Sequence, residues 1–467
     1  MKRRDALKTI GGLAGAASLA KLLPGCGGDD GPTGITTYVF VMLENRTYDH
    51  VLGARKLEGL GGDGISTGMT QPDVNGTQVA LYVPGPNDEC VIDPPHTWEA
   101  SHAQWNNGAM DGFLREHQIT YGSTTAKESL QYLTRNEQPI TWALADAYTS
   151  CDRWFASVMG PTFPNRAYWH TGTSYGLNNT TALIDRLADG VPAPTIYNRL
   201  EAAKIDWAYY YGTYPITALI AGAGPYQLDL GPSDGTGKIR RFGDEIAGVG
   251  QFFKDAAAGK LPSVVYIDPA FGENDDHPPV HPIRAQQLVA SIYNALAKSP
   301  QWKNVLLVVT YDEHGGFFDH VPPPRAEADD TLAIYGVDGF QQLGFRVPAL
   351  VIGPYVKQGY VSSVQREHVS PLKHLQTTFG LAPINPRIDA ATDLSECMDM
   401  DRLMRGDPAD PIKLPKIDLD AWPHDAPQCG MARFDGLPPQ PELHLWLDRN
   451  PGKWDPQWDL RPHKRGR

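Results

Sequence analysis

Short apolar runs alternate along the chain with longer segments in which apolar residues recur at helical spacing. The short runs predict strands at 38–43, 207–211, 263–267, 305–309 and 348–352. The run 305–309 is apolar at every position, which is typical of a strand buried on both faces of a sheet. The helical spacing predicts helices at 140–155, 196–203, 243–258, 284–298 and 370–379. Because strands and helices alternate, we expect an α/β fold with a mostly parallel central sheet and helices on both faces.

The rest of the chain is rich in glycine and proline. Its 47 glycines and 40 prolines lie in separate clusters, and 41% of all residues are hydrophobic, which favours loops around an ordered core over disorder. We therefore expect one domain over 36–467, with loop-rich insertions at about 54–135 and a C-terminal cover at about 385–467.

The first 25 residues have the features of an export signal. Adjacent arginines at positions 3 and 4 precede an apolar stretch over 9–23, which is shorter than the roughly 20 residues of a membrane-spanning helix. This pattern is typical of a twin-arginine signal, so we expect an exported protein with the twin-arginine machinery as a partner. Leu-Pro-Gly before Cys26 resembles a lipoprotein cleavage site, and residues 26–35 would then form a tether. The expected locations are a membrane-tethered lipoprotein, the periplasm, or the medium.

The net charge and the cysteines bear on possible partners and on disulfide bonds. The formal net charge of −13 argues against nucleic-acid binding through a general basic surface. If Cys26 carries a lipid, then Cys90, Cys151, Cys397 and Cys429 are left in an oxidising compartment. One or two disulfides are expected, and the sequence does not give the pairing.

Acidic residues follow two of the predicted strands. Glu44 and Asn45 come after the first strand, and Asp312 and Glu313 come after 305–309. Ligands of open α/β sheets bind beyond the carboxyl ends of the strands, and a buried carboxylate is costly unless it is paired or bound to metal. Oxygen ligands of this kind suit hard or borderline divalent cations, so we expect one such ion at these residues.

A hydroxyl group adds a candidate nucleophile. Thr162 lies in Gly-Pro-Thr-Phe-Pro-Asn-Arg, where a proline in the first turn predicts the start of a helix. The positive end of a helix cradles phosphate, and a threonine hydroxyl on a metal becomes a usable nucleophile. Arg166, four residues further on, would either clamp a phosphoryl group or pair with a neighbouring acid.

Taken together, these segments resemble the family of bacterial phospholipases C and acid phosphatase A, within the alkaline-phosphatase-like superfamily. The matching stretches occur in family order at 44–50, 93–98, 108–113, 160–166, 274–279, 311–324 and 346–350. The resemblance implies an alkaline-phosphatase-like fold that hydrolyses phosphoric esters. One departure is His281, which stands where the family usually has an acid.

The resemblance also implies roles for single residues. The family's metal and nucleophile positions correspond to Glu44, Asn45, Thr162, Asp312 and Glu313. Its phosphate-contacting or proton-transferring histidines correspond to His96, His277 and His320, and His368 resembles a further conserved histidine. The metal would be calcium, manganese, magnesium or zinc.

The expected reaction passes through a phosphothreonine on Thr162, and the substrate is a small phosphate ester or a phospholipid. One alternative is a sulfatase-like hydrolase, because the spacing around Thr162 matches the sulfatase signature. Threonine cannot become formylglycine, since oxidation of its β-carbon would give a ketone. Another alternative is a non-catalytic, metal-binding surface lipoprotein.

Overall fold

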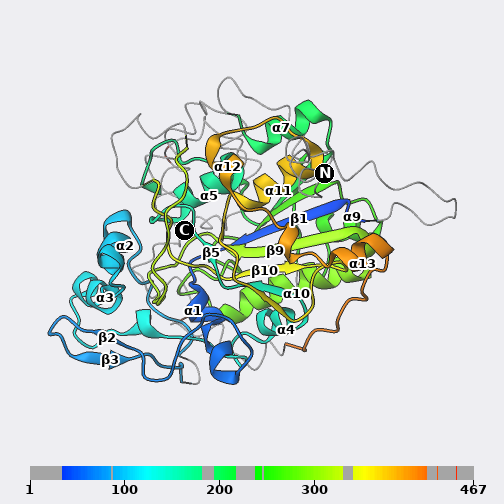
Figure 1. Cartoon of the computed structure of the whole chain (residues 1–467). Helices are drawn as coiled ribbons and strands as arrows, with labels where there is room; N and C mark the ends of the chain where they lie inside the picture. The colour runs from blue at the N-terminus through cyan, green and yellow to red at the C-terminus, as the bar shows by residue number, and fades with distance from the viewer. Residues whose placement is uncertain are drawn as a thin grey trace, which may run out of the picture.

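A computed structural model describes residues 34–85, 88–180, 194–216, 237–244, 247–329 and 340–417, together with Cys429 and Arg449 (Figure 1). The predicted export signal lies outside the described residues, as do all but the last two residues of the tether and most of the chain beyond residue 417.

One eight-stranded sheet forms the centre of the molecule, in the order β11-β4-β10-β9-β1-β8-β6-β7. These strands are β1 (Thr37–Leu43), β4 (Thr149–Cys151), β6 (Trp207–Tyr211), β7 (Ile239–Arg241), β8 (Val264–Asp268), β9 (Val305–Tyr311), β10 (Ala349–Ile352) and β11 (Tyr360–Ser362). Strand β10 is antiparallel to both of its neighbours, and the other pairings are parallel. The predicted α/β fold with a mostly parallel sheet is therefore confirmed.

Helices cover both faces of this sheet (Figure 1). One layer holds α5 (Thr162–Thr171), α7 (Ile196–Ala203), α11 (Ser370–Phe379) and α12 (Pro386–Ala390). The other holds α4 (Pro139–Ala147), α9 (Gln251–Ala257) and α10 (Pro282–Lys298). Every residue of β1 and β9 is buried, because the strands lie between the two layers.

An insertion with its own small core lies beyond one end of the sheet (Figure 1). It contains β2 (Thr70–Pro72), β3 (Gln78–Ala80), α2 (Trp98–Trp105) and α3 (Phe113–Tyr121). Apart from short 3-10 helices, the remaining elements of the described residues are α1 (Tyr48–Val51), α13 (Met400–Arg405) and a pair of short strands, β5 (Trp154–Phe155) and β12 (Arg366–Glu367). Phe318 and Phe345 join the core of the insertion to the body of the molecule.

Two predicted helices are too long. The helix predicted at 140–155 ends at Ala147, because Tyr148 is extended and 149–151 pairs with β10 and β11 instead. The helix predicted at 243–258 begins only at Gln251. Gly243 and Gly250 have φ values of +121° and +134°, and a Cβ on either would meet backbone atoms of the other segment. This close approach closes a turn before the helix.

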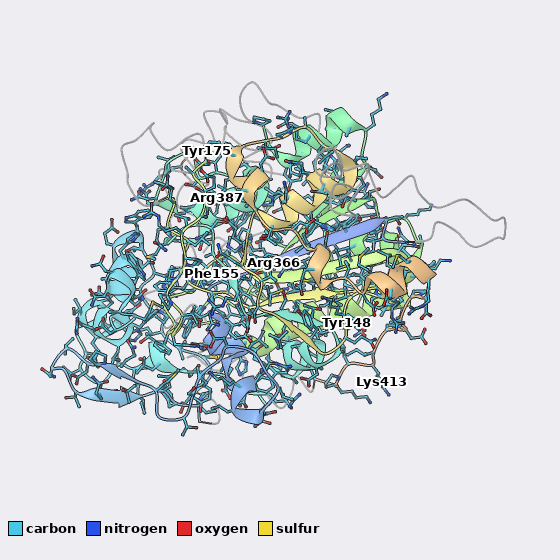
Figure 2. The ribbon with its side chains drawn as sticks, in the orientation of Figure 1. Tyr148, Phe155, Tyr175, Arg366, Arg387 and Lys413 are labelled. Carbon is cyan, nitrogen blue, oxygen red and sulfur yellow. A yellow bond between two sulfur atoms is a disulfide. The ribbon has the colours of Figure 1, made fainter. Side chains whose placement is uncertain are left out.

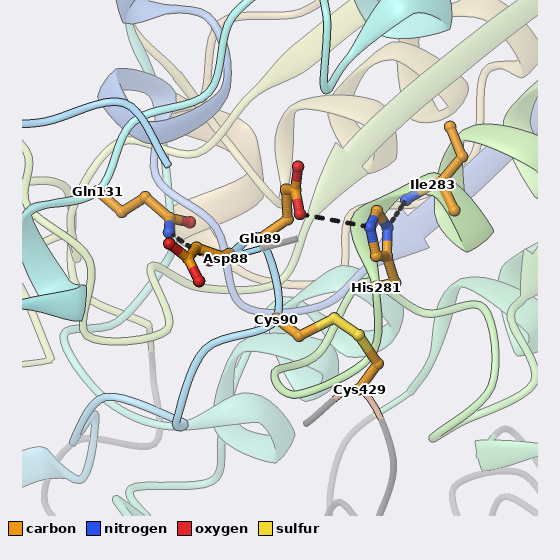
Figure 3. Close-up of a disulfide and its surroundings, with 7 residues drawn as sticks. All are labelled: Asp88, Glu89, Cys90, Gln131, His281, Ile283 and Cys429. Carbon is orange, nitrogen blue, oxygen red and sulfur yellow. Dashed lines mark hydrogen bonds and ion pairs between the residues drawn. A yellow bond between two sulfur atoms is a disulfide. The ribbon is translucent and has the colours of Figure 1, made fainter. Parts of the chain in front are cut away.

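A disulfide joins Cys90 to Cys429 across 339 residues of sequence (Figure 3). The prediction of at least one disulfide is therefore confirmed, while Cys151 and Cys397 are buried free thiols. Within the described part of the chain, no helix has the length and apolar character needed to cross a membrane.

Candidate active site

The acidic ends of β1 and β9 meet because these strands are parallel neighbours. The amide of Asn45 donates to Asp312 Oδ1 at 3.0 Å, and the amide of Arg46 donates to the carbonyl of Glu313 at 3.0 Å. Asn45 has a φ of 61°, a left-handed conformation that asparagine tolerates better than most residues. Gly315 lies so close to the Asn45 carbonyl that a Cβ would approach its oxygen to 2.2 Å. The turn after β9 therefore needs glycine at this position.

Thr162 is the first residue of α5, as the sequence predicts. Its hydroxyl donates to Glu44 Oε2 at 3.3 Å, and the side chain is almost fully buried. The preceding loop is fixed by Asn165, which accepts from the amide of Val158 and donates to its carbonyl and to that of Gly160. These bonds orient the N-terminus of α5 toward the acids at the strand ends.

A second anchor of the loop before Thr162 comes from α12 and β12. Ser157 Oγ donates to Glu367 Oε2 at 2.8 Å, and Arg387 pairs with the same oxygen at 2.7 Å. Arg387 also donates to the carbonyl of Ser157. Arg387 is buried in the layer above the sheet (Figure 2), so this anchor is held within the core.

Arg166 provides the positive charge behind the site. Its guanidinium lies 2.6 Å from Glu44 Oε1, 3.1 Å from Asp268 Oδ1 and 3.4 Å from Asp312 Oδ2, and the side chain has no exposed surface. It also donates to the carbonyls at the end of β1. The sequence predicts that Arg166 either clamps a phosphoryl group or pairs with a neighbouring acid, and these contacts correspond to the second role.

The single positive charge of Arg166 does not balance the negative charges of the carboxylates around it. Burial raises the pKa of Glu44 well above its usual range, and the neighbouring Asp312 adds to the rise. Burial also raises the pKa of Asp312 to about 6, although Arg166 opposes the shift. Asp312 Oδ2 accepts no hydrogen bond from the described residues. A buried carboxylate oxygen without a donor, among further carboxylate, amide and hydroxyl oxygens, suits a divalent cation.

Asn45 connects these acids to two histidines. With its amide oriented to donate to the carboxylates, its nitrogen lies 2.7 Å from Glu313 Oε1 and 3.2 Å from Glu44 Oε2. In that orientation its oxygen accepts from His277 Nε2 at 3.0 Å. His96 Nε2 lies 3.4 Å from the same amide group. The structure thus brings Glu44, Asn45, Asp312, Glu313, Thr162, Arg166, His96 and His277 together.

His96 is the more exposed of the two histidines in this group, at 15% of its side chain. Its Nδ1 donates to the carbonyl of Pro94, and its Nε2 lies 3.8 Å from Glu313 Oε1. Burial alone would lower the pKa of His96, but the carboxylates of Glu313 and Asp93 raise it to about 9. At neutral pH the ring is therefore protonated and able to donate.

His320 lies in a different cluster. Its Nδ1 donates to Asp49 Oδ2 at 2.6 Å and its Nε2 to Asp63 Oδ1 at 3.2 Å, while Arg346 pairs with Asp49. Within the described residues it makes no hydrogen bond or ion pair with Glu44, Thr162 or Glu313.

His368 and His281 take supporting positions. His368 Nε2 donates to the carbonyl of Asp312 at 2.5 Å, and burial lowers its pKa to about 3. His368 is therefore a neutral ring that contacts the site through the backbone of Asp312. His281 Nδ1 accepts from the amide of Ile283 and caps the N-terminus of α10 (Figure 3). His281 therefore serves as a helix cap in this chain.

Sequence reasoning assigned no role to Asp268 or Asp93. Asp268 ends β8 and pairs with Arg166, and burial raises its pKa to about 7. Its signal was an acid at the end of an apolar run, as for Glu44 and Asp312. Asp93 lies 3.7 Å from His96 and 3.9 Å from His277, but its position in a loop gives no signal of this kind.

Comparison with known proteins gives the family. The model of the Phosphoesterase family matches residues 35–382, so the chain belongs to that family. Non-specific phospholipase C6 of Arabidopsis thaliana is 32% identical over 363 residues, which cover 70% of this chain and 63% of the plant protein. The chain thus spans less than two thirds of that relative's length.

Two further proteins illustrate the range of similarity. Phospholipase C A of Mycobacterium tuberculosis is 31% identical, over 75% of this chain and 74% of its own length. Among solved structures, a phosphonate monoester hydrolase of Agrobacterium radiobacter aligns with a TM-score of 0.37 and 11% identity, covering 78% of this chain and 77% of its own.

Proposed function

We propose that the protein is a metal-dependent phosphoesterase of the phospholipase C type, with Thr162 as its nucleophile. The observation that carries the proposal is the Thr162 hydroxyl, which lies at the start of a helix and donates to a buried carboxylate at the end of the central strand. A phosphate bound there would face the positive end of α5, where backbone amides stabilise anions.

The cation would be held by the carboxylates of Glu44, Asp312 and Glu313 and the hydroxyl oxygen of Thr162. Asn45 would join them with its amide turned so that the oxygen, not the nitrogen, faces the carboxylates. When bound, a divalent ion lowers the pKa of a ligated hydroxyl and compensates the charge that spreads over a phosphoryl group. Oxygen ligands favour calcium, manganese or magnesium over zinc.

Side chains of the protein position the nucleophile, donate the proton and orient the phosphoryl group. The hydrogen bond to Glu44 holds Thr162 Oγ1 for in-line attack on phosphorus, and Arg166 fixes Glu44 from behind. His96, protonated at neutral pH, donates a proton to the departing alkoxide. His277 and Asn45 orient the phosphoryl oxygens. The hydroxyl proton of Thr162 is lost to solvent before the first attack. His96, neutral after protonating the alkoxide, takes a proton from the water that hydrolyses the phosphothreonine, and Thr162 leaves as the alkoxide. Two in-line steps give net retention at phosphorus.

The relatives favour phospholipids over small monoesters as substrates. The plant and mycobacterial relatives named above are phospholipases C, and the match extends over most of the body of this chain. Cleavage of phosphatidylcholine would then release diacylglycerol and phosphocholine. An acid phosphatase would instead release inorganic phosphate from p-nitrophenyl phosphate, and assaying both reactions over several divalent ions separates the two activities.

The nucleophile is tested by substitution of Thr162. Thr162→Ala should abolish turnover while leaving the thermal melt close to that of the wild type, and Thr162→Ser should keep partial activity. Thr171, at the other end of α5, is equally buried and provides the matched control as Thr171→Ala. Near-wild-type turnover by Thr162→Ala would exclude Thr162 as the nucleophile. Loss of activity in Thr171→Ala alone would show that activity depends on the packing of α5.

We further propose that the enzyme is exported by the twin-arginine route and tethered through a lipid on Cys26. The twin arginines and the sequence before Cys26 support this location, and a disulfide is the kind of bond that persists in an oxidising compartment. The mass of the mature N-terminus tests it. Cleavage before Cys26 with an added diacylglycerol is expected, and an unmodified N-terminus downstream would indicate a released enzyme.

A further inference from the structure

His314 is a buried polar side chain to which the proposed mechanism gives no role. It follows Glu313 directly, and only 2% of its surface is exposed. Its ring packs against Phe345 at 4.4 Å and faces Phe113 at 6.4 Å between centroids. A polar ring in such apolar surroundings needs hydrogen-bond partners, so its contacts indicate what it holds in place.

Those contacts lead from the acids to the histidine loop. His314 Nε2 donates to Gln104 Oε1 at 2.7 Å, and its Nδ1 lies 3.0 Å from Glu313 Oε2. Gln104 in turn donates through Nε2 to the carbonyl of Pro95 at 2.7 Å. Gln104 is fully buried on α2. Two hydrogen bonds and the close His314–Glu313 contact thus connect a carboxylate at the end of β9 to the residue before His96.

We propose that His314 and Gln104 are positioning residues that fix Glu313 and His96 relative to each other. The inference rests on the proposed function, because it assigns these residues to the cation and proton-donor sites described there. The His314–Gln104 bridge would fix the orientation of the Glu313 side chain at one end. At the other end it would fix the position of the loop that carries His96.

The Glu313 end of the bridge fixes a carboxylate. Glu313 Oε2 accepts from the amide of Gly315 at 2.8 Å and lies 3.0 Å from His314 Nδ1, which leaves Oε1 directed toward Asn45 and His96. With one oxygen held by the Gly315 amide and against the His314 ring, the carboxylate cannot rotate freely. Hydrogen bonds of this kind to a ligating carboxylate typically contribute 10- to 100-fold in metal affinity or activity.

The Gln104 end fixes a loop that belongs to the insertion rather than to the sheet. Helix α2 begins just after His96, with Thr97 as its N-cap, and Ser101 Oγ donates to the His96 carbonyl at 3.3 Å. Gly316 packs so closely on this loop that a Cβ would approach the Pro95 oxygen to 2.6 Å. A shift of α2 would therefore be transmitted to His96.

The bridge is tested with two variants that replace its polar side chains by apolar side chains of related shape. His314→Phe should fit beside Phe113 and Phe345, and Gln104→Leu should replace one buried side chain by another of similar size. Calorimetric titration of the metal-free proteins with Mn²⁺, Ca²⁺ and Zn²⁺, each alone, measures affinity without any turnover. We expect both variants to bind the ion that wild-type enzyme binds most tightly about 10- to 100-fold more weakly. The double variant should lose little more, because both substitutions break one chain of bonds.

The matched control is Gln118→Leu on α3 of the same insertion. Gln118 is also buried and donates to the carbonyls of Thr124 and Ala126, away from the acids. This control should lower the melting temperature while keeping the wild-type metal affinity. Equal metal affinities of Gln104→Leu and Gln118→Leu would overturn the proposal, whatever their melting temperatures.

A conservative variant separates the two ends of the bridge. Gln104→Glu keeps an acceptor for His314 but presents a second carboxylate oxygen to the Pro95 carbonyl. Metal affinity should remain near the wild-type value while kcat falls with little change in KM. A parallel loss of affinity would contradict this division. If the proposed function is wrong, Thr162→Ala will still turn over substrate, which is a different result from any of those given for the bridge. A wild-type protein that binds neither these three ions nor Mg²⁺ would overturn both proposals.

Discussion

Replacing Arg166 by methionine tests whether the acids of the site depend on a single guanidinium. The substitution keeps a long side chain but leaves Glu44, Asp268 and Asp312 without the cation that lies within 3.4 Å of each. Removing one partner of a buried ion pair typically costs about 3–5 kcal/mol. We expect a loss of this size in the free energy of unfolding at pH 8 with chelator present.

The loss should depend on pH in a defined direction. The pKa of Asp268 is raised to about 7 and that of Asp312 to about 6, mainly by burial, and Arg166 limits both rises. Without Arg166 these pKa values rise further, so the folded variant holds protons that the unfolded chain releases. Each such proton lowers stability by about 1.4 kcal/mol per pH unit as the pH increases. The deficit of the variant should therefore be larger at pH 8 than at pH 6.

The assay is urea unfolding at pH 6, 7 and 8 in the presence of chelator, with Arg387→Met as the control. Arg387 is also a buried arginine paired with a glutamate, but it lies outside the acid cluster. Its variant should lose stability by a similar amount without the growth from pH 6 to pH 8. A deficit below about 1 kcal/mol in Arg166→Met, or one that does not change with pH, would refute this account of the charge balance.

Three further predictions concern the proton donor, the disulfide and acid stability. His96→Gln should slow cleavage of esters with alkoxide leaving groups about 10²- to 10⁴-fold but affect p-nitrophenyl phosphate far less, and wild-type kcat/KM should fall at alkaline pH as the ring loses its proton; equal effects on both esters would exclude His96 as the acid. Replacing Cys90 and Cys429 by serine should lower the free energy of unfolding by about 2–5 kcal/mol, because a 339-residue loop is released, and an unchanged urea midpoint would contradict this. Burial would raise the pKa of Glu396, but bonds from Ser362 and Tyr360 lower it from 4.5 to about 2, so its stabilisation is present above pH 4.5 and is lost as the pH falls toward 2. Glu396→Gln should flatten that part of the acid-unfolding profile, and an unaltered profile would count against the assignment.

Much of the fold could be predicted because the buried strands carry strong local signals. The run 305–309 is apolar throughout, and 207–211 forms a strand with the predicted bounds. The segment after Ala147 could not be predicted in this way. Its apolar residues continue the helical pattern, and only the distant strands β10 and β11 make it a strand. Pairing between segments about 200 residues apart leaves no trace in a local pattern.

The residues of the candidate site also divide into those that the local sequence predicts and those that depend on distant contacts. Glu44 and Asp312 could be predicted because an acid at the end of a buried strand has few explanations other than pairing or a metal. Asp268 carries the same signal directly after 263–267, and its contact with Arg166 shows that it belongs to the site. His96 and His320 matched family motifs equally well. Only the packing of the insertion places His96 beside Glu313, whereas His320 lies against Asp49.

The central position of β1 has a consequence for biosynthesis. Tyr38 pairs with Leu306 of β9, so the first strand of the chain waits for a partner roughly 270 residues later. At a translation rate of about 5–20 residues per second, that interval lasts roughly 15–55 s. During this time an apolar strand has emerged from the ribosome without its neighbours in the sheet. We expect nascent chains to bind chaperones until Tyr311 has left the ribosome and to be released afterwards, because only then is the core strand paired on both sides.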